Sequence, residues 1–270
     1  MIVGYYIVGF IDILGQREHF KNSPQLLDNN KDEIISLLKR TFFKIESFKE
    51  IIETIISSFD NYDFKYFDKE KFNIPEVRYS RFSDCLEMHS CMSEITGKEV
   101  PLTSLYLILL ACAGINILSL ADGYSVRGGL TIGIACETAE VSIYGPALHS
   151  AVSLEEHNAV FPRIVVDKKI VDYINFKKNG KGENHKARLE RELAIKCSEL
   201  IISDSDNYFI HFLSSKVFDI LSKNKNEIKN RVKSFVIDQI NSESISTRVR
   251  EKYQWIIEYD KNSDNTLNFT

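Results

Sequence analysis

The sequence predicts an α+β protein in which helices pack on one face of a mainly antiparallel sheet. Two observations lead to this expectation. Short runs of β-branched and aromatic residues alternate along the chain with longer stretches whose apolar residues recur at helical spacing. Some of the strand-like runs also follow one another closely, which indicates hairpins as well as the helical connections of an α/β sheet.

Size and composition narrow the class of protein. The chain has 270 residues, 44% of them hydrophobic, which suits one large domain or one domain with appendages. Its net charge of -4 argues against a general nucleic-acid binder, which is usually basic. The five scattered cysteines form no close metal-ligand pair and predict free thiols in a reducing cytoplasm.

The first elements follow from local pattern. Small, aromatic and β-branched residues alternate at 4–14 and predict a central strand. We expect a first strand and not a signal peptide, because the run has no basic leader and Asp12 interrupts it. Residues 31–59 carry apolar residues at helical spacing, which predicts one long amphipathic helix or two shorter ones. We expect a loop at 60–75 and a hairpin at 76–90.

The longest apolar run predicts a buried helix at 102–120, after a connection at 92–101. The run is borderline for a membrane span of ~20 residues. Asp122 and a strand follow it at once, so we favour a helix inside the protein and no membrane contact. Gly123 stops this helix, and the next strand is expected from Arg127 to Cys136.

The second half alternates between the same types of element. In order, we expect a loop at 137–145, a helix at about 146–158, a strand at 163–167, a solvated loop with a helix start at 176–192, a strand at 208–213, and helices at about 217–241 and 246–258. The last ten residues are expected to be frayed. We therefore divide the chain into a main domain at 1–215, with the helix at about 31–59 as an insertion, and a helical extension at 216–270.

Two aspartates stand out from their surroundings. Asp12 and Asp84 each lie in a short apolar, strand-like run. A carboxylate in such a run is costly unless it is paired or binds a metal. Either residue alone could merely end its strand and cap a turn. If the two strands pair, both carboxylates reach one edge of the sheet, which suits divalent cations and a phosphate substrate.

The order of four short motifs resembles the class III nucleotidyl cyclase domain. These are Phe-Ile-Asp-Ile-Leu-Gly at 10–15, Phe-Ser-Asp at 82–84, Arg-Gly-Gly-Leu-Thr-Ile-Gly at 127–133, and Gly-Pro-Ala-Leu-His-Ser-Ala-Val-Ser-Leu-Glu at 145–155. The resemblance covers roughly residues 5–167. It implies a ferredoxin-like βαββαβ core, so that 1–215 would be a nucleotide cyclase catalytic domain.

Further details resemble the bacterial pyrimidine cyclases of the Pycsar anti-phage system. They are Asp-Ile-Leu-Gly at 12–15, Tyr-Gly-Pro-Ala-Leu at 144–148, Pro-Arg-Ile-Val-Val at 162–166 and Lys-Tyr-Gln-Trp-Ile-Ile-Glu-Tyr at 252–259. This resemblance implies a cytoplasmic enzyme that makes a cyclic nucleotide second messenger for a separate effector protein. It also implies a head-to-tail homodimer with its sites at the subunit interface.

The resemblance assigns roles to the two aspartates and to Ile13. Asp12, Asp84 and the backbone carbonyl of Ile13 would hold two ions, and oxygen ligands suit Mn²⁺ or Mg²⁺. The ribose 3′-oxygen of a bound nucleoside triphosphate would attack the α-phosphorus, and pyrophosphate would leave. The expected enzyme is thus a phosphorus-oxygen lyase.

The sequence departs from the family where the transition state is stabilised. His149 stands at the position of the family's Asn, and Ser153 at that of its Arg. Loss of the arginine removes a charge that can be worth several kcal/mol. Arg127, Arg163 and Lys168 are candidates to replace it, and Arg163 is also expected to bind the substrate. His149 is either catalytic or a histidine on the helix surface.

The residues expected to read the base also differ from those of purine cyclases. Ser80 occupies the position at which adenylate cyclases have Lys and guanylate cyclases Glu, and the second reader position falls on Ser142. Short neutral residues leave room for another reader, either Tyr79 or Arg81, unless both simply face outward. We therefore expect UTP or CTP as substrate.

Three alternatives remain open from the sequence. The chain could be a catalytically silent cyclase-like domain that binds a nucleotide or a partner, as the absence of the Asn and Arg suggests. It could use a purine triphosphate, ATP or GTP. It could also join nucleotides as a polymerase does, because the related palm fold uses two carboxylates.

Overall fold

The computed structural model describes residues 1–15, 31–58, 77–94, 102–138, 142–205, 207–221 and 224–269. The loop expected at 60–75 and most of the connection expected at 92–101 lie outside these ranges. The described strands are β1 (Ile2–Ile13), β2 (Arg78–Phe82), β3 (Cys85–Glu94), β4 (Val126–Glu137), β5 (Ile143–Tyr144), β6 (Ile164–Val166), β7 (Ile201–Ser203) and β8 (Tyr208–Ile210). The described helices are α3 (Lys31–Ser57), α4 (Thr103–Ala121), α5 (Pro146–His157), α6 (Lys168–Lys178), α7 (His185–Glu199), α8 (Ser215–Leu221), α9 (Lys225–Asn241) and α10 (Thr247–Asn262).

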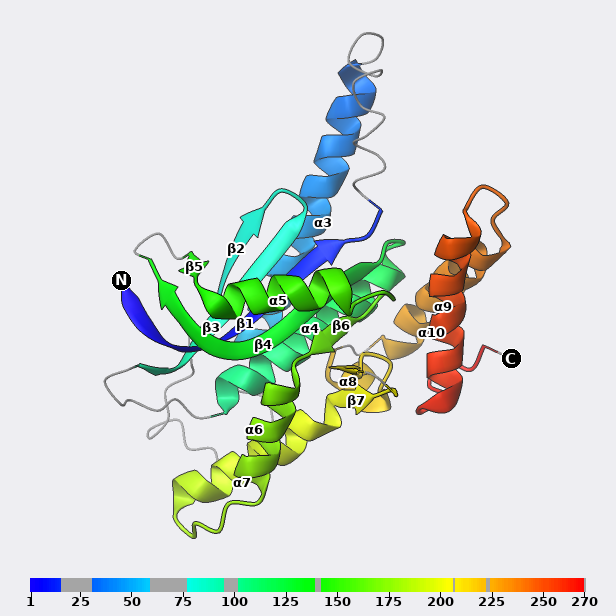
Figure 1. Ribbon diagram of the computed structural model, residues 1–270. Coiled ribbons are helices and arrows are strands. Elements are labelled where there is room, and N and C mark those ends of the chain that lie inside the picture. The colour runs from blue at the N-terminus through cyan, green and yellow to red at the C-terminus, as the bar shows by residue number, and fades with distance from the viewer. Residues whose placement is uncertain are drawn as a thin grey trace.

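All described strands belong to one mixed sheet, which confirms the α+β class. The strand order is β2-β3-β1-β4-β6-β8-β7, with β5 beside β4. The pair β4–β6 is parallel, whereas the other pairs are antiparallel. The central position of β1, between β3 and β4, agrees with the apolar character that predicted a central strand (Figure 1).

Helices cover both faces of the sheet, so the expectation of helices on one face is wrong. Successive residues of β1 point to opposite faces: Ile7 joins the main core around α4, and Tyr6 joins a smaller cluster beneath α5. Figure 1 shows α5 lying across β4 on the face opposite α4. The helix at 146–158 was expected, but its side of the sheet depends on the path of the chain after β4.

Glycines in β4 let α5 approach the sheet closely. A Cβ atom at Gly129 would lie 2.1 Å from the carbonyl oxygen of Ala151 and 2.6 Å from Cβ of Leu154. A Cβ at Gly133 would lie 3.4 Å from that of Ala147, which is an ordinary contact. The close approach at Gly129 brings the C-terminal half of α5 down to the end of the sheet that carries Asp12.

α4 is the central core helix. It is the one helix in the described residues that is apolar and long enough to cross a membrane, and 94% of its apolar window is buried within the protein. A helix facing lipid would expose that surface. Its all-round hydrophobicity is explained by its neighbours, since α3, α7, α9 and the sheet surround it.

The charged stretch at 176–192 is more helical than expected. α6 ends at Lys178 and α7 begins at His185, so only the short segment between them is a loop. Asn184 caps α7 by accepting a hydrogen bond from the backbone N–H of Ala187. The helix was not predicted in full because charged residues surround Leu189 and Leu193. These two leucines are four residues apart and are buried on one face of α7.

Two further expectations need correction in the C-terminal part. The helix expected at about 217–241 is divided into α8 and α9, and β7 was not foreseen because Ile201–Ser203 is too short for a periodic signal. The last ten residues were expected to be frayed, but those that the structure describes, up to Phe269, are held in place. Buried Asp260 accepts hydrogen bonds from the backbone N–H groups of Leu267 and Asn268, each at 3.0 Å, which holds the tail against α10.

The C-terminal helices pack on the main core of the same chain. Val232 and Val236 of α9 and Tyr253 and Ile256 of α10 belong to the hydrophobic cluster that contains α4. Trp255 stacks on Phe161 with ring centroids 5.0 Å apart. The extension at 216–270 therefore completes the core of the main domain, and α10 reaches the end of the sheet that carries Asp12.

Candidate active site

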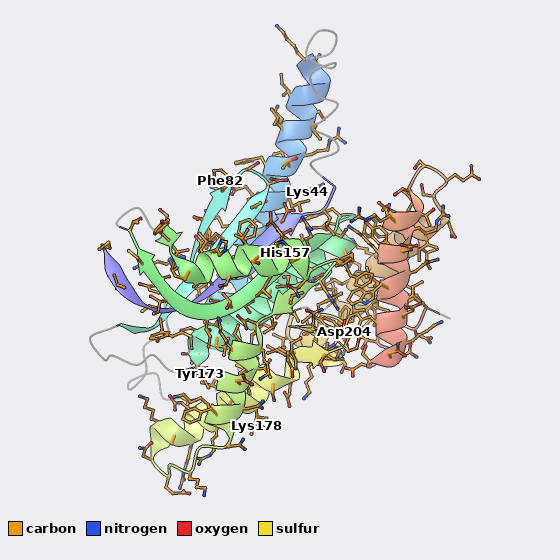
Figure 2. The ribbon with its side chains drawn as sticks, viewed as in Figure 1. Lys44, Phe82, His157, Tyr173, Lys178 and Asp204 are labelled. Carbon is orange, nitrogen blue, oxygen red and sulfur yellow. The ribbon has the colours of Figure 1, made fainter. Side chains whose placement is uncertain are left out.

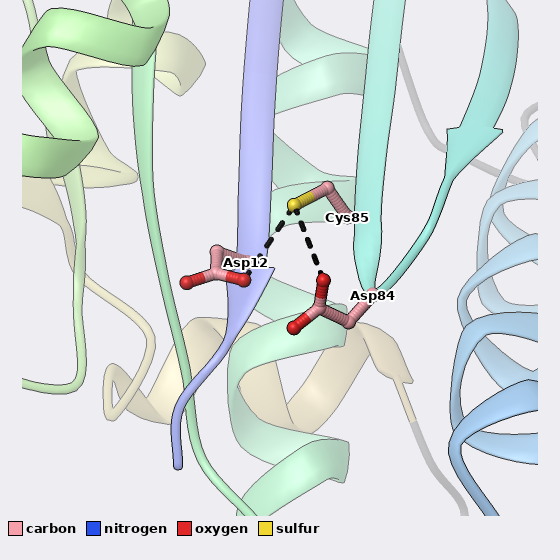
Figure 3. Close-up of side chains that lie close together, drawn as sticks. All are labelled: Asp12, Asp84 and Cys85. Carbon is pink, nitrogen blue, oxygen red and sulfur yellow. Dashed lines mark hydrogen bonds between the residues drawn. The ribbon is translucent and has the colours of Figure 1, made fainter. Parts of the chain in front are cut away.

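The paired strands bring the two predicted carboxylates together. Asp12 lies at the end of β1, and Asp84 lies in the two-residue turn between β2 and β3. In the β1–β3 register Asp12 is opposite Cys85, the residue after Asp84. One ligand atom from each of these three side chains lies within 4.8 Å of the others (Figure 3). The convergence expected from the sequence is thus a feature of the structure.

Cys85 is a member of this cluster that the sequence did not single out. Its thiol lies between the carboxylates, with Sγ 3.5 Å from Oδ1 of Asp12 and 4.0 Å from Oδ1 of Asp84 (Figure 3). Burial and the two neighbouring negative charges raise the pKa of the thiol far above its usual range. Cys85 is therefore a neutral donor to both carboxylates.

Asp12 is held in an environment that disfavours its negative charge. Burial, and then the charge of Asp84, raise the pKa of its carboxyl above the ordinary value of 3.8, while Arg127 acts in the opposite direction. Nη2 of Arg127 lies 3.4 Å from Oδ2 of Asp12. A second cation bound beside Asp12 would offset the remaining free-energy cost of its buried negative charge.

Arg127 also contacts a buried carboxylate from α5. Its Nε lies 2.5 Å from Oε1 of Glu155, a side chain that is only 2% exposed. Arg127 therefore divides its charge between Asp12 and Glu155. The close packing of α5 at Gly129 produces this arrangement, because it lowers Glu155 onto the end of β4.

A cavity of about 210 Å³ adjoins Asp12. Its walls come from the end of β1 and the turn after it, from the start of β4, and from one face of α10. Asp12, Arg127, Lys252 and Tyr253 are among the residues that line it, together with Ile13. The cavity therefore combines a carboxylate with two cationic side chains.

A second polar cluster lies on the same face of the sheet as Asp12, two to four residues further along β3 from Cys85. Oγ of Ser80 donates to Oε2 of Glu87 at 2.7 Å, and Oε1 of Glu87 lies 2.7 Å from Nδ1 of His89. Nε2 of His89 lies 3.7 Å from Glu137, which pairs with Arg78. Glu87, His89 and Glu137 are all buried, so this cluster is a fixed part of the sheet surface.

Tyr79 and Arg81 project from the opposite face of β2. The hydroxyl of Tyr79 donates to Glu53 of α3 at 2.8 Å, and Arg81 pairs with Glu46 of the same helix. Successive residues of a strand alternate between faces, so of Tyr79, Ser80 and Arg81 only Ser80 points to the side of Asp12. The structure does not bring Tyr79 or Arg81 to the carboxylates.

Arg163 is held among aromatic rings. Its guanidinium carbon lies 4.9 Å from the ring centre of Phe209 and 5.4 Å from that of Trp255, and the side chain pairs with Asp204, labelled in Figure 2. It is 3% exposed. These contacts direct Arg163 into the packing between β8 and α10, and not into the cavity beside Asp12.

The remaining predicted residues lie along α5 and the turn before it. His149 is exposed on α5, and the hydroxyl of Ser153 lies 3.4 Å from His157, which Figure 2 labels on that helix. Ser142 precedes β5, and its hydroxyl lies 3.1 Å from that of Thr138. Lys168 forms an exposed pair with Asp172. Asp12, Ile13, Asp84 and Arg127 are the predicted residues that meet at one place.

Sequence reasoning missed several residues of the site. Cys85, Glu87 and His89 alternate along β3, and this period of two from the residue after Asp84 could have identified them. Glu155 is the last residue of the helix-start motif at 145–155, although nothing in its spacing indicates a contact with Arg127. Lys252 had no local signal, because its place depends on how α10 docks.

The chemistry of the site is inferred from these residues alone. No protein-family model matches the chain, and no match to a curated protein was found.

Proposed function

We propose that this protein is a nucleotide cyclase with a class III nucleotidyl cyclase-like fold, which converts UTP or CTP into the 3′,5′-cyclic monophosphate and pyrophosphate. One observation carries the proposal: Asp12 and Asp84 converge at the end of adjacent strands, beside a cavity with cationic walls. Paired carboxylates next to a cationic pocket suit a metal-bound polyphosphate.

The residues present fit two divalent ions. Asp12 and Asp84 supply four oxygen atoms at one edge of the sheet, and Ile13 lines the adjoining cavity, where its carbonyl would add a ligand. Oxygen ligands suit Mn²⁺ or Mg²⁺. The raised pKa of Asp12 is the sign of a carboxylate that binding of a cation would stabilise.

The reaction forms the bond from the ribose 3′-oxygen to the α-phosphorus and breaks the bond from that phosphorus to the β-phosphate oxygen. The 3′-hydroxyl proton is released, and pyrophosphate leaves with the bonding electrons. When bound, the metal ions would lower the pKa of the 3′-hydroxyl and neutralise the leaving group. Asp12 and Asp84 position the reacting groups, and Arg127 stabilises negative charge at the phosphates.

The polar cluster around Glu87 supports a base other than those read by Lys or Glu at position 80. Ser80 is short and already donates to Glu87, so the two side chains form one recognition surface. A carboxylate held in this way accepts hydrogen bonds from N–H groups of a base, and such groups occur on uracil and cytosine. Base selection would then lie with Ser80 and Glu87, and His89 would hold the Glu87 carboxylate in place.

A head-to-tail homodimer would complete the site. His149 is exposed on α5 and is accessible to a second subunit, as a catalytic group supplied in trans would have to be. Ser153 carries no charge, so the cations that remain on this chain, first of all Arg127, have to stabilise the transition state. The protein would act in the cytoplasm, and its product would serve as a second messenger for a separate effector in anti-phage defence.

A product assay tests the proposal. Purified protein is incubated with each of ATP, GTP, CTP and UTP in Mn²⁺ and in Mg²⁺, and the products are identified by mass. A 3′,5′-cyclic pyrimidine monophosphate, absent with Asp84→Ala, is the expected result. A cyclic purine product would overturn the base choice, and a linear dinucleotide would identify a polymerase-like enzyme.

The neutral Ser153 favours one second candidate, a silent cyclase-like domain that binds a nucleotide. Calorimetry separates it from the enzyme. Binding of UTP or CTP with Mn²⁺ but without any product, at every protein concentration that permits dimers, would support the silent domain.

A further inference from the structure

We propose that a second cavity, at the edge strand β7, binds an uncharged planar heterocycle with an amide or amidine edge, of the kind that a nucleobase or nucleoside carries. This β7 cavity has a volume of about 280 Å³ and lies between α6, the end of α7 and the strands β7 and β8. It shares no lining residue with the cavity beside Asp12. The inference is therefore independent of the proposed cyclase activity.

Apolar side chains line the β7 cavity from two sides. Val171 and Ile174 are three residues apart on α6, so they share one face of that helix, and both line the cavity. Ser203 of β7 is opposite Tyr208 of β8, and Ile201 is two residues before Ser203. Ile201, Ser203 and Tyr208 therefore share one face of the sheet and form the other side of the cavity. A flat ring between helix and strands would bury apolar surface on both of its faces.

The polar groups of the β7 cavity are all uncharged. Among the described residues that line it, the polar ones are Asn175, Ser198, Ser203 and Tyr208, and none carries a charged side chain. The hydroxyl of Ser198 already donates to the backbone carbonyl of Ile195 at 2.7 Å. A phosphate or carboxylate would find no cation among these residues, and a buried charge without a partner is costly. The cavity therefore suits an uncharged ligand that forms hydrogen bonds.

The free edge of β7 adds backbone donors and acceptors to the cavity. β7 is the last strand of the described sheet and pairs with β8 alone. The backbone N–H of Asp204 donates to the carbonyl of Asn207, and hydrogen-bonded pairs alternate with non-hydrogen-bonded pairs along an antiparallel ladder. The pair of Ser203 and Tyr208 is thus of the second kind. The N–H and C=O groups of Ser203, and by the same alternation those of Ile201, point away from β8.

A cyclic amide or amidine matches this strand edge. The N–H and C=O of Ser203 face the same way, so a ring with an acceptor next to an N–H pairs with both groups, as a further strand would. All common nucleobases have such an edge, for example N3–H and O4 of uracil. The amide of Asn175 on α6 offers a further donor and acceptor. The volume of about 280 Å³ is just below the about 300–1,000 Å³ of pockets for drug-sized ligands, which suits a molecule of one or two rings.

Titration with uncharged nucleosides in EDTA tests this site without metal or turnover. Adenosine, cytidine and uridine are added separately to protein with labelled isoleucine methyl groups, and NMR gives the affinity and the resonances that shift. Ser203→Phe fills the cavity from an exposed position of β7, and Asn175→Leu removes the amide. Asn179→Leu is the matched control, because Asn179 is an exposed asparagine at the end of the same helix. Thermal unfolding of each variant confirms that the fold is retained.

We expect at least one nucleoside to bind and to shift the methyl resonances of Ile174 and Ile201, but not that of Ile13 in the other cavity. Ser203→Phe should weaken this binding about tenfold or more and Asn175→Leu about three- to tenfold, and Asn179→Leu should leave it unchanged. The assignment is overturned if none of the three nucleosides binds, if Ser203→Phe binds as tightly as wild type, or if the shifts occur at Ile13 and not at Ile174 and Ile201.

Discussion

Arg127 and Glu155 form a buried ion pair, with Nε of the arginine 2.5 Å from Oε1 of the glutamate, directly beside Asp12. The arginine comes from β4 and the glutamate from α5, so the pair links the end of the strand to the helix that covers it. Glu155 neutralises part of the positive charge of Arg127. Asp12 is therefore not fully neutralised by the arginine and can still bind a metal ion.

Replacing Glu155 with Gln should therefore weaken metal binding. Without the competing carboxylate, Arg127 pairs with Asp12 alone and opposes the entry of a cation. We expect the half-saturating Mn²⁺ concentration to rise about tenfold, or about 1.4 kcal/mol. Calorimetric titration with Mn²⁺ measures this, and Glu156→Gln, an exposed neighbour on α5, is the control. An unchanged affinity in Glu155→Gln would contradict the role of the pair.

Replacing Asp12 with Asn should make the thermal stability of the protein independent of Mn²⁺. Asp12 carries a charge that burial and Asp84 disfavour, so the metal-free variant should be at least as stable as wild type at pH 7. Mn²⁺ should raise the Tm of wild type and leave that of Asp12→Asn unchanged. Thermal unfolding with Mn²⁺ or EDTA measures both effects, with exposed Asp172→Asn as the control. A full Mn²⁺ response in Asp12→Asn would rule out Asp12 as a ligand.

Replacing Arg163 with Lys separates a structural role from the substrate-binding role predicted by the sequence. The planar guanidinium stacks among Phe161, Phe209 and Trp255, and an ammonium group cannot reproduce these contacts. We expect a loss of about 1–2 kcal/mol in unfolding free energy, measured in urea, with no change in KM. Arg188→Lys, on the exposed surface, should change neither. A raised KM at full stability would instead restore Arg163 to the substrate site.

The pH dependence of stability should reflect His211. Burial lowers the pKa of this histidine below 6.5, although Asp264 opposes the shift, and the ring lies 2.7 Å from the hydroxyl of Tyr259. Below pH 6.5 the unfolded chain binds this proton more readily than the folded protein, so stability falls on acidification. Unfolding free energies between pH 7.5 and 5 should fall less steeply for His211→Gln than for wild type. His157→Gln, at an exposed histidine, should keep the wild-type slope, and an unchanged slope in His211→Gln would exclude the effect.

Replacing Gly129 with Ala should displace α5. The new methyl group would lie 2.1 Å from the carbonyl oxygen of Ala151, so the helix must move and carry Glu155 with it. We expect a loss of about 3 kcal/mol, at the upper end of the cost of overpacking, together with loss of activity. Gly133→Ala, which meets Ala147 at 3.4 Å, should remain near wild type in urea denaturation. Equal stability of the two variants would show that α5 does not depend on Gly129.

Local patterns in the sequence were sufficient for most of the fold. β-branched and aromatic runs identified β1, β3 and β4, helical spacing identified α3, and the longest apolar run identified α4, because burial imposes these patterns. The convergence of Asp12 and Asp84 could also be predicted, since each lies at the end of a strand in a hairpin-containing sheet. Cys85 could have been identified by the period of two that it shares with Glu87 and His89 along β3.

The sequence by itself determined most of the longer elements and the two aspartates, since both depend on residues close together in the chain. Only the tertiary structure decided which face α5 covers, that Arg127 lies between Asp12 and Glu155, that Tyr79 and Arg81 turn toward α3, and that α10 lines the cavity. These relationships join residues up to 240 positions apart, as with Asp12 and Lys252. They are fixed by the packing of helices on the sheet, which leaves no local pattern in the chain.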